Sequence, residues 1–392
     1  MKSYNGVAHS SEKGVLLYSW LFSVTFVTIF LFYFRYLGRM KKVLIIILFF
    51  TPLITLMSCG GESDSKSDAV VIPEGLYEKA KSMFKPQFDV AHSEINPITN
   101  EKVYLGKALY YDTRLSKEGN NSCNSCHNLK TFGVDNKPTS EGDNGGFGTR
   151  NSPTVYNAAF HTMQFWDGRA KDVEEQVGMP ILNPVEMAIP SEEFLVERLS
   201  QVPEYQDLFK KAFPEDAEPL TFENISNAIA AFELTLVTSS AFDRFLADNK
   251  TALTQKQVDG LKTYLDVGCQ TCHMGSQLGG TMFQKFGLYG DYRDFTNSKT
   301  NDEGKKDVTN EDADKDIFKV PGLRNISKTY PYFHDGSVTD LKDAVRIMAK
   351  VELGKDLNDT EVENIVAFLE ALTGEIPTEA LEIPKEAVVN EI

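Results

Sequence analysis

Residues 123–127 read Cys-Asn-Ser-Cys-His, and residues 269–273 read Cys-Gln-Thr-Cys-His. In each pentapeptide two thiols lie three positions apart, on one helical turn, and an imidazole follows on the next residue. This spacing lets both sulfurs bond the vinyl groups of a haem while the histidine reaches the iron from the same side. Two motifs therefore predict two covalently bound haem c groups. The predicted haem-binding residues are Cys123, Cys126, His127, Cys269, Cys272 and His273.

Zinc binding and disulfide formation are the alternatives for these cysteines. Four cysteines and two histidines could in principle bind zinc, but the two pairs are far apart in the chain and each has its own adjacent histidine. A disulfide within each pair would leave both histidines unexplained. The chain also carries an export signal, described below, and haem is attached in the exported compartment. Haem attachment is therefore the stronger interpretation.

The sequence around the two motifs repeats loosely. In the first half the motif is followed by Arg-Asn at 150–151 and by Phe-Trp-Asp-Gly at 165–168. In the second half the same order recurs, with Arg-Asn at 324–325 and Phe-His-Asp-Gly at 333–336. The shared order predicts two related domains that meet near residue 245.

Helical patterning dominates the body of the chain, and no convincing series of strands is present. Thr254 and Gln257 form a capping box ahead of an apolar helical face, and apolar residues over 362–372 keep helical spacing until Gly374 and Pro377. We predict an all-α protein with two c-type cytochrome domains, each binding one covalent haem. The predicted boundaries are 81–245 for the N-terminal haem domain, 246–375 for the C-terminal haem domain and 376–392 for an acidic tail.

Two apolar stretches open the chain. Residues 15–34 carry no charge and are long enough to span a bilayer. Residues 40–58 combine a basic start, a short apolar core and a Leu-Met-Ser ending before Cys59, which resembles a bacterial lipoprotein signal peptide. We therefore predict acylation of Cys59, with several acyl chains as a stable membrane anchor, and residues 59–80 as the lipidated cysteine and a tether. Residues 1–39 are then an upstream extension, with an extra membrane segment as the alternative.

This signal places the protein in the periplasm, anchored by lipid to a membrane. The outer membrane is the first choice, and display at the cell surface is the alternative. The whole chain has 40 Lys and Arg against 56 Asp and Glu, a net charge of −16. Such an acidic protein repels phosphate backbones, so we expect no nucleic-acid partner. The charge suits a transient encounter with a small basic protein, although plain solubility explains it equally well.

The second axial position of each iron decides between electron transfer and catalysis. In the second half, apolar residues from Leu341 onward keep helical spacing and place Met348 on the inner face, so a His273–Met348 pair could hold the iron. A packed core methionine is the alternative. In the first half a helix is interrupted at Gly178 and Pro180, which makes a helical ligand harder to build.

The haem of His127 is therefore expected to keep an open face. Met179, Met187 and His161 are rival ligands for this position. The loop after the interrupted helix carries Glu186, which could take the proton from one oxygen of a bound peroxide and return it to the other. A solvated loop carboxylate is the alternative reading of Glu186.

With these residues identified, residues 90–375 resemble the bacterial di-haem cytochrome c peroxidases. The matching segments, in order, are LGKALYYDTRLS, CNSCHNL, RNSPTVYNAAF, QFWDGRA, PVEM, CQTCH, VPGLRNISKTYPYFHDG and LKDAVRIM. This ordered set is far more specific than one haem motif. The resemblance implies reduction of hydrogen peroxide to water with electrons from a small c-type cytochrome or a similar redox protein, and a homodimer by analogy.

The resemblance also implies roles for individual residues. It makes His127 the proximal ligand of a low-potential, peroxidatic haem and Glu186 the acid–base residue beside it. It places His273 and Met348 on a high-potential, electron-accepting haem. Trp166 would lie between the haems as an electron route.

Two further assignments follow from the same resemblance. His334 falls where the family has a histidine at a haem edge. A calcium ion at the domain junction would use the side chain of Asn151 and the carbonyls of Thr329 and Pro331, because this hard cation prefers oxygen ligands.

One segment departs from the family pattern. Many members carry, between the first haem motif and RNSPT, a histidine that blocks the peroxidatic iron until the other haem is reduced. Residues 139–150 contain no histidine, and Asp143 lies near the expected position. We therefore expect an open, five-coordinate or water-bound haem that is active without prior reduction.

Two alternative functions remain at this stage. The chain could oxidise a partner protein through a high-valent haem, as the di-haem enzymes that mature methylamine dehydrogenase do, but those place a tyrosine where Met348 stands. It could also be a non-enzymatic di-haem electron carrier. Glu186 and the missing blocking histidine argue against that carrier function.

Overall fold

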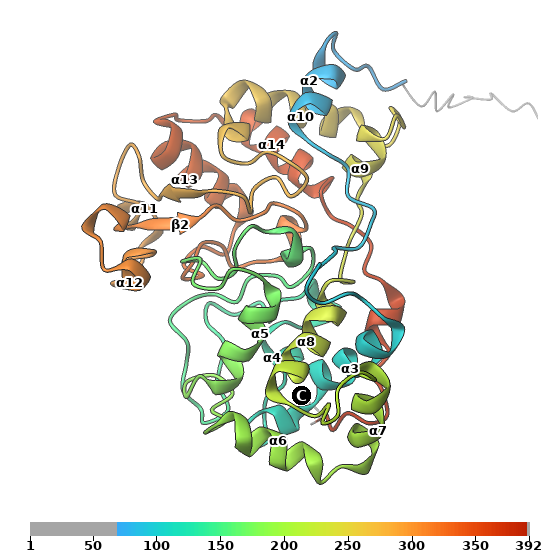
Figure 1. The fold of residues 1–392 in the computed structure, drawn as a ribbon. Coiled ribbons are helices and arrows are strands. Elements are labelled where there is room, and N and C mark those ends of the chain that lie inside the picture. Colours follow the sequence, from blue (N-terminus) through green and yellow to red (C-terminus); the bar gives the residue numbers. More distant parts are fainter. Residues whose placement is uncertain (1–68, 390–392) are drawn as a thin grey trace, which may run out of the picture. The chain divides into compact units, whose positions relative to one another are not determined.

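The computed structural model describes residues 69–389 (Figure 1). Both predicted apolar stretches, the signal peptide and Cys59 lie outside the described residues. Within the described part of the chain, no helix is long and apolar enough to cross a membrane.

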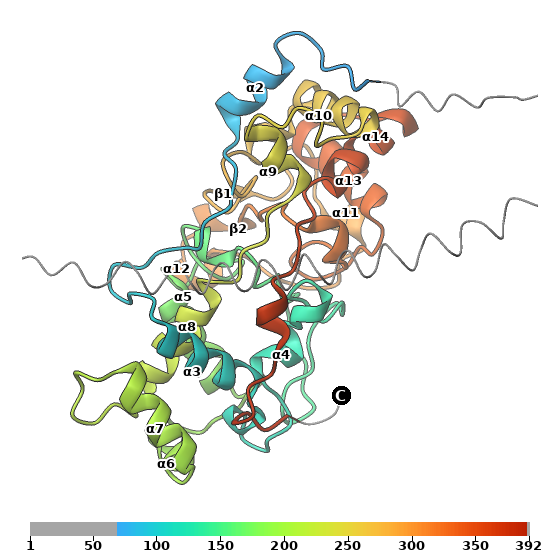
Figure 2. The same ribbon diagram turned by 90° about the vertical axis from the view of Figure 1, so that its right-hand side faces the viewer.

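The described residues are mainly helical and surround two hydrophobic cores (Figures 1 and 2). The helices that build the first core are α3 (Asn100–Tyr111), α5 (Val173–Leu182), α6 (Glu192–Ser200), α7 (Pro203–Ala212) and α8 (Phe222–Glu233). Those that build the second are α2 (Leu76–Met83), α9 (Ala241–Leu246), α10 (Gln255–Val267), α13 (Leu341–Leu353) and α14 (Asp359–Glu370). The short helices α4 (Cys123–Cys126), α11 (Arg293–Thr296) and α12 (Lys306–Thr309) lie in the connecting segments. Single 3-10 turns are η1 (Thr113–Leu115), η2 (Leu129–Thr131), η3 (Ala158–Phe160), η4 (Cys269–Thr271), η5 (Asp312–Asp314), η6 (Ile326–Lys328) and η7 (Thr378–Leu381).

Each core is centred on one pair of closely packed helices, α3 with α8 and α10 with α14. A glycine allows the close approach in both pairs. A Cβ atom on Gly106 would lie 1.8 Å from the carbonyl oxygen of Ala228, and one on Gly260 would lie 2.1 Å from that of Asn364. The capping box predicted at Thr254 is confirmed, because its side chain accepts from the N–H of Gln257 at the start of α10.

Within residues 69–389, strands are confined to one small sheet. β1 (Phe283–Lys285) pairs antiparallel with β2 (Ile317–Lys319), with Phe283 opposite Lys319. The all-α prediction therefore describes both cores, and the long segment between α10 and α13 adds this two-stranded exception.

The two ends of the described chain cross over to the opposite cores. Helix α2 lies beside α9 (Figure 2). It packs in the second core, where Leu76 and Tyr77 are buried and the Tyr77 ring is edge-on to Phe245 at 5.2 Å. The tether predicted up to residue 80 is wrong for this helix, because an apolar face packs there. At the other end, Ala380 is buried in the first core.

The segment predicted as a tail, 376–392, is in fact fastened to the first core over its described residues. The Tyr111 hydroxyl donates to the carbonyl of Ala380 at 2.9 Å, and the N–H of Thr113 donates to that of Val388 at 2.9 Å. The acidic composition of this segment does not indicate this role, because the segment makes these contacts through its main-chain carbonyls.

Candidate active site

A cavity of about 250 Å³ lies beside the second haem motif. Cys269, Cys272 and His273 line it from η4 and the residues that follow, and Met348 lines it from α13. The imidazole Nδ1 of His273 lies 3.1 Å from the carbonyl oxygen of Leu278. Donation from Nδ1 to that carbonyl leaves the Nε2 lone pair free for a metal.

The lining of this cavity fits a haem. Most of the wall is apolar, as the faces of a porphyrin require, and two thiols, an imidazole and a thioether supply the attachment and ligand atoms. His334 also lines it, and its Nε2 is buried without a hydrogen-bond partner among the described residues. A buried polar atom without a partner in a cofactor-sized cavity indicates a missing polar group of the cofactor. The apolar lining residues include Tyr264, Leu341, Val345, Ile365 and Leu369.

The first haem motif is built in the same way. Cys123 and Cys126 are the ends of α4, and His127 follows as its C-cap. The Nδ1 of His127 lies 2.9 Å from the carbonyl oxygen of Pro153, so this imidazole also keeps Nε2 free. Burial lowers the pKa of both His127 and His273, which favours the neutral imidazole that binds iron.

A tyrosine behind each motif escaped the sequence reasoning. The Tyr110 hydroxyl donates to the carbonyl of His127 at 2.6 Å, and the Tyr264 hydroxyl donates to that of His273 at 2.9 Å. Each tyrosine lies on the helix before its motif, on α3 or α10. The available signal was a tyrosine on the buried face of the preceding helix in both halves.

The four motif cysteines form no disulfide. Burial raises the pKa of Cys126 and of Cys269 to about 11. Within residues 69–389, no group of three or more His, Cys, Asp and Glu side chains is arranged to hold a metal ion.

Glu186 lies on the turn that follows α5, beside the first motif. Asn183 donates from Nδ2 to Glu186 Oε1 at 2.8 Å. Burial raises the pKa of Glu186, and the charge of Arg169 and the Asn183 amide partly offset this. The negative charge of Glu186 makes a minor contribution to the raised pKa of Cys126, whose main cause is burial.

Two of the rival ligands have other surroundings. The side chain of Met187 is buried in the first core. His161 lines the cavity of the second motif, and its Nδ1 lies 3.2 Å from Nζ of Lys319. Met179, the third rival, is partly buried on α5.

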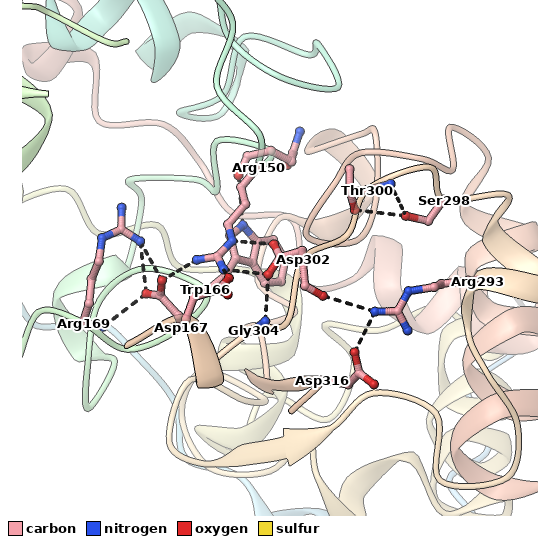
Figure 3. A network of polar contacts seen from close by, with 12 residues as sticks. Arg150, Trp166, Asp167, Arg169, Arg293, Ser298, Thr300, Asp302, Gly304 and Asp316 are labelled. Carbon is pink, nitrogen blue, oxygen red and sulfur yellow. Dashed lines mark hydrogen bonds and ion pairs between the residues drawn. The ribbon is translucent and has the colours of Figure 1, made fainter. Parts of the chain in front are cut away.

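Trp166 lies at the junction of the two halves and lines the cavity of the second motif (Figure 3). Its indole N–H donates to the carbonyl of Asn151 at 2.9 Å, and its own carbonyl accepts from the N–H of Lys319 at 2.7 Å. The indole is also edge-on to His334, with ring centroids 6.4 Å apart. These contacts fix the ring from both halves of the chain.

An ionic network surrounds this tryptophan (Figure 3). Arg150 donates to both oxygens of Asp302, at 2.6 Å and 2.7 Å, and also to Asp167. Asp167 accepts from Arg169 as well, at 3.0 Å. Burial alone would raise the pKa of Asp302, but Arg150 outweighs it and the net pKa is lowered. Arg150 thus joins two carboxylates from opposite halves of the sequence.

The three residues expected at a calcium site, Asn151, Thr329 and Pro331, all line the cavity beside the second haem motif. The Asn151 amide nitrogen donates to the carbonyl of Lys137 at 2.8 Å, which leaves its oxygen turned away from that contact.

Residues 100–251 match the family model described as di-haem cytochrome c peroxidase. The chain is 45% identical over 306 residues to the cytochrome c551 peroxidase of Pseudomonas aeruginosa, covering 78% of this chain and 88% of that protein. It is 45% identical over 290 residues to the cytochrome c551 peroxidase of Nitrosomonas europaea, covering 74% and 85%. A solved MauG-like protein associated with microbial copper homeostasis superposes with a TM-score of 0.68 at 28% identity, over 76% of this chain and 97% of that one. The chain belongs to the di-haem cytochrome c peroxidase family.

Proposed function

We propose that this protein reduces hydrogen peroxide to water with electrons from a reduced c-type cytochrome or a similar donor, and that its two haem sites divide the work. The relatives at 45% identity are cytochrome c551 peroxidases and match over most of their length. The observation that carries the proposal is the contrast between the two sites. Met348 lines the cavity of the second site, whereas the half-buried carboxylate of Glu186 lies near the first.

Each site has residues suited to hold a haem. Cys123, Cys126 and His127 would hold the peroxidatic haem, and Cys269, Cys272, His273 and Met348 would hold the electron-accepting haem, with His334 as a further residue of that cavity. When bound, the haems supply the electrons and the iron that peroxide cleavage needs.

The chain's own residues move the protons. Glu186, held by Asn183, accepts the proton from one oxygen of the peroxide and returns it to the departing oxygen, and two electrons and two protons complete two water molecules. A raised pKa suits this exchange, because it makes the Glu186 carboxylate a stronger proton acceptor. Trp166, fixed between the halves, provides the route for electrons from the second site.

We expect the enzyme to work without prior reduction, because residues 139–150 contain no histidine that could block the first haem. Asp143, which lies near the position expected for the blocking histidine, instead accepts hydrogen bonds from Ser116, Glu118 and Asn120. The test compares oxidation of ferrocytochrome c by peroxide in as-isolated and pre-reduced enzyme. Equal turnover supports the proposal, and low-spin ferric spectra for both haems as isolated would contradict it.

The same assay tests Glu186. In Glu186→Gln we expect kcat to fall by about 100- to 10,000-fold, the usual contribution of general acid–base catalysis. Glu141→Gln is the control, because Glu141 is an exposed carboxylate on the neighbouring loop. Unchanged turnover in Glu186→Gln would remove the acid–base role.

We also propose a calcium site, a lipid anchor and a dimer. Asn151, Thr329 and Pro331 bind calcium, which ties the halves together, so a chelator should lower the melting temperature of the holoenzyme. Cys59 carries the lipid that anchors the enzyme to the periplasmic face of the outer membrane. The enzyme acts as a homodimer, and light scattering of the lipid-free protein tests this.

Oxidation of a partner protein is the less supported alternative. It would require a high-valent state shared by both haems, and a thioether at the second iron favours simple electron transfer instead. The place of Met348 in the cavity wall therefore favours the peroxidase.

A further inference from the structure

Asp143 is a buried carboxylate that the proposed chemistry does not use. Its residue is only 4% exposed although the next residue in the loop is exposed. Oδ1 accepts from the Ser116 hydroxyl at 2.7 Å and from the Asn120 N–H at 2.9 Å, and Oδ2 accepts from the Glu118 N–H at 2.6 Å. Three donors to one buried carboxylate make strong, charge-assisted hydrogen bonds, so this side chain holds the segment 116–120.

The main chain around Asp143 holds a different segment, the turn that carries Glu186. The N–H of Asp143 donates to the carbonyl of Glu186 at 2.7 Å, and the Asn144 amide donates to the carbonyl of Pro184 at 3.0 Å. The two backbones touch at Gly142, where a Cβ atom would lie 1.8 Å from the carbonyl oxygen of Val185. The loop 142–144 is therefore packed directly on the Glu186 turn.

The segment 116–120 also contacts the Glu186 turn directly. The N–H of Lys117 donates to the carbonyl of Met187 at 2.8 Å. Arg198 of α6 donates to the carbonyl of Ser116 at 2.6 Å and to that of Lys117 at 2.9 Å. The segments 116–120, 142–144 and 184–187 thus brace one another, and Asp143 is the residue that binds both of the others.

We propose that Asp143 is a positioning residue for peroxide reduction, which fixes the turn bearing Glu186 by joining it to the segment 116–120. This inference rests on the acid–base role proposed for Glu186. Asp143 touches neither substrate nor iron in this role, because both of its carboxylate oxygens already accept hydrogen bonds from the protein. Its contribution is to the geometry of the Glu186 carboxylate, on which proton transfer depends.

The test is steady-state kinetics of the holoenzyme with Asp143→Asn. An amide has one acceptor oxygen, so it turns an N–H₂ group toward donors and loosens the brace while keeping the size of the side chain. We expect kcat to fall by about 10- to 100-fold, the effect of moving a catalytic group by about 1 Å, with an unchanged KM for the donor cytochrome. The ferric spectrum of the first haem should change, and that of the second should not.

Ser116→Ala is a milder variant that removes one of the three donors, and we expect a smaller fall in kcat. Glu141→Gln, in the same loop, should behave like the unmodified enzyme. Haem content and melting temperature show whether each variant is folded. If Asp143→Asn does not fold, Ser116→Ala decides, and wild-type kcat and spectrum in that variant would overturn the inference.

A parallel Glu186→Gln variant separates the two proposals. Wild-type turnover in Glu186→Gln would show that the acid–base role itself is wrong. A fall in Glu186→Gln together with wild-type kcat, KM and spectra in a folded Asp143→Asn would refute only the positioning role of Asp143.

Discussion

The two haem motifs are fixed by the same kinds of hydrogen bond, but the helices and side chains near them differ. In both, the histidine Nδ1 lies against a main-chain carbonyl, and a tyrosine from the preceding helix donates to the carbonyl of that histidine. On the far side of the second site an uninterrupted helix, α13, brings Met348 to the cavity. Beside the first, α5 contains Pro180 and gives way to a turn with Glu186. The residues that would attach a haem are thus distinct from those that would decide whether it transfers electrons or reacts with peroxide.

The ion pair of Arg150 joins the two halves, and its loss should have the largest effect on stability. Arg150→Gln would leave Asp167 and Asp302, each 5% exposed, without their shared cation. Breaking a buried pair from one side costs about 3–5 kcal/mol. Chemical denaturation of the holoenzyme measures this loss. Arg293→Gln is the control, because its pair with Asp316 lies within the second half.

The same variant has a pH signature. Because Arg150 lowers the pKa of Asp302 below its ordinary value of 3.8, the stability that the pair contributes is fully present above that value and is lost as the pH falls through the lowered pKa. The difference in stability between the wild type and Arg150→Gln should therefore be constant near neutral pH and shrink in strong acid. A difference that grows toward acid would contradict the pairing.

Met348→Leu should make the second site resemble the first by removing its thioether. We expect the potential of the second haem to fall, since thioether favours ferrous iron, and turnover with the donor cytochrome to slow. The equilibrium constant for one-electron uptake changes about tenfold for each 59 mV. Redox titration of the two haems checks this. Met274→Leu is the control, because Met274 is 40% exposed next to His273; an unchanged second potential in Met348→Leu would mean that Met348 is only a core residue.

The acid limb of the pH profile should report Glu186. Its carboxylate form accepts the peroxide proton, so kcat/KM for peroxide should fall as the pH drops through its raised pKa. Arg169 lowers that pKa, so Arg169→Gln should move the acid limb to higher pH. Lys171→Gln removes an exposed cation nearby and should leave the limb in place. A shift to lower pH in Arg169→Gln would argue against Glu186 as the titrating group.

The smallest expected change in stability tests whether the tyrosines behind the two haem motifs are equivalent. Tyr110→Phe and Tyr264→Phe each remove one hydrogen bond to the carbonyl of a proximal histidine. Each variant should lose about 1 kcal/mol of stability, the usual net value of such a bond. Thermal unfolding of both holoenzymes compares them directly. A loss confined to one variant would show that the two tyrosines are not equivalent.

The sequence alone predicted the features that depend on contacts between residues close to one another in the chain. The two Cys-x-x-Cys-His motifs, the capping box at Thr254 and the helix that carries Met348 rest on contacts within a few residues, and local spacing determines them. The order of the quoted segments was also sufficient for the family.

Contacts between distant residues were decided only by the tertiary structure. Arg150 and Asp302 are 152 positions apart, and Asp143 meets the Glu186 turn through main-chain atoms that carry no side-chain signal. The exchange of α2 and the C-terminal segment between the cores is of the same kind. Periodicity shows that a face is apolar but not which surface it will cover, because that choice depends on the shape and burial of the assembled chain.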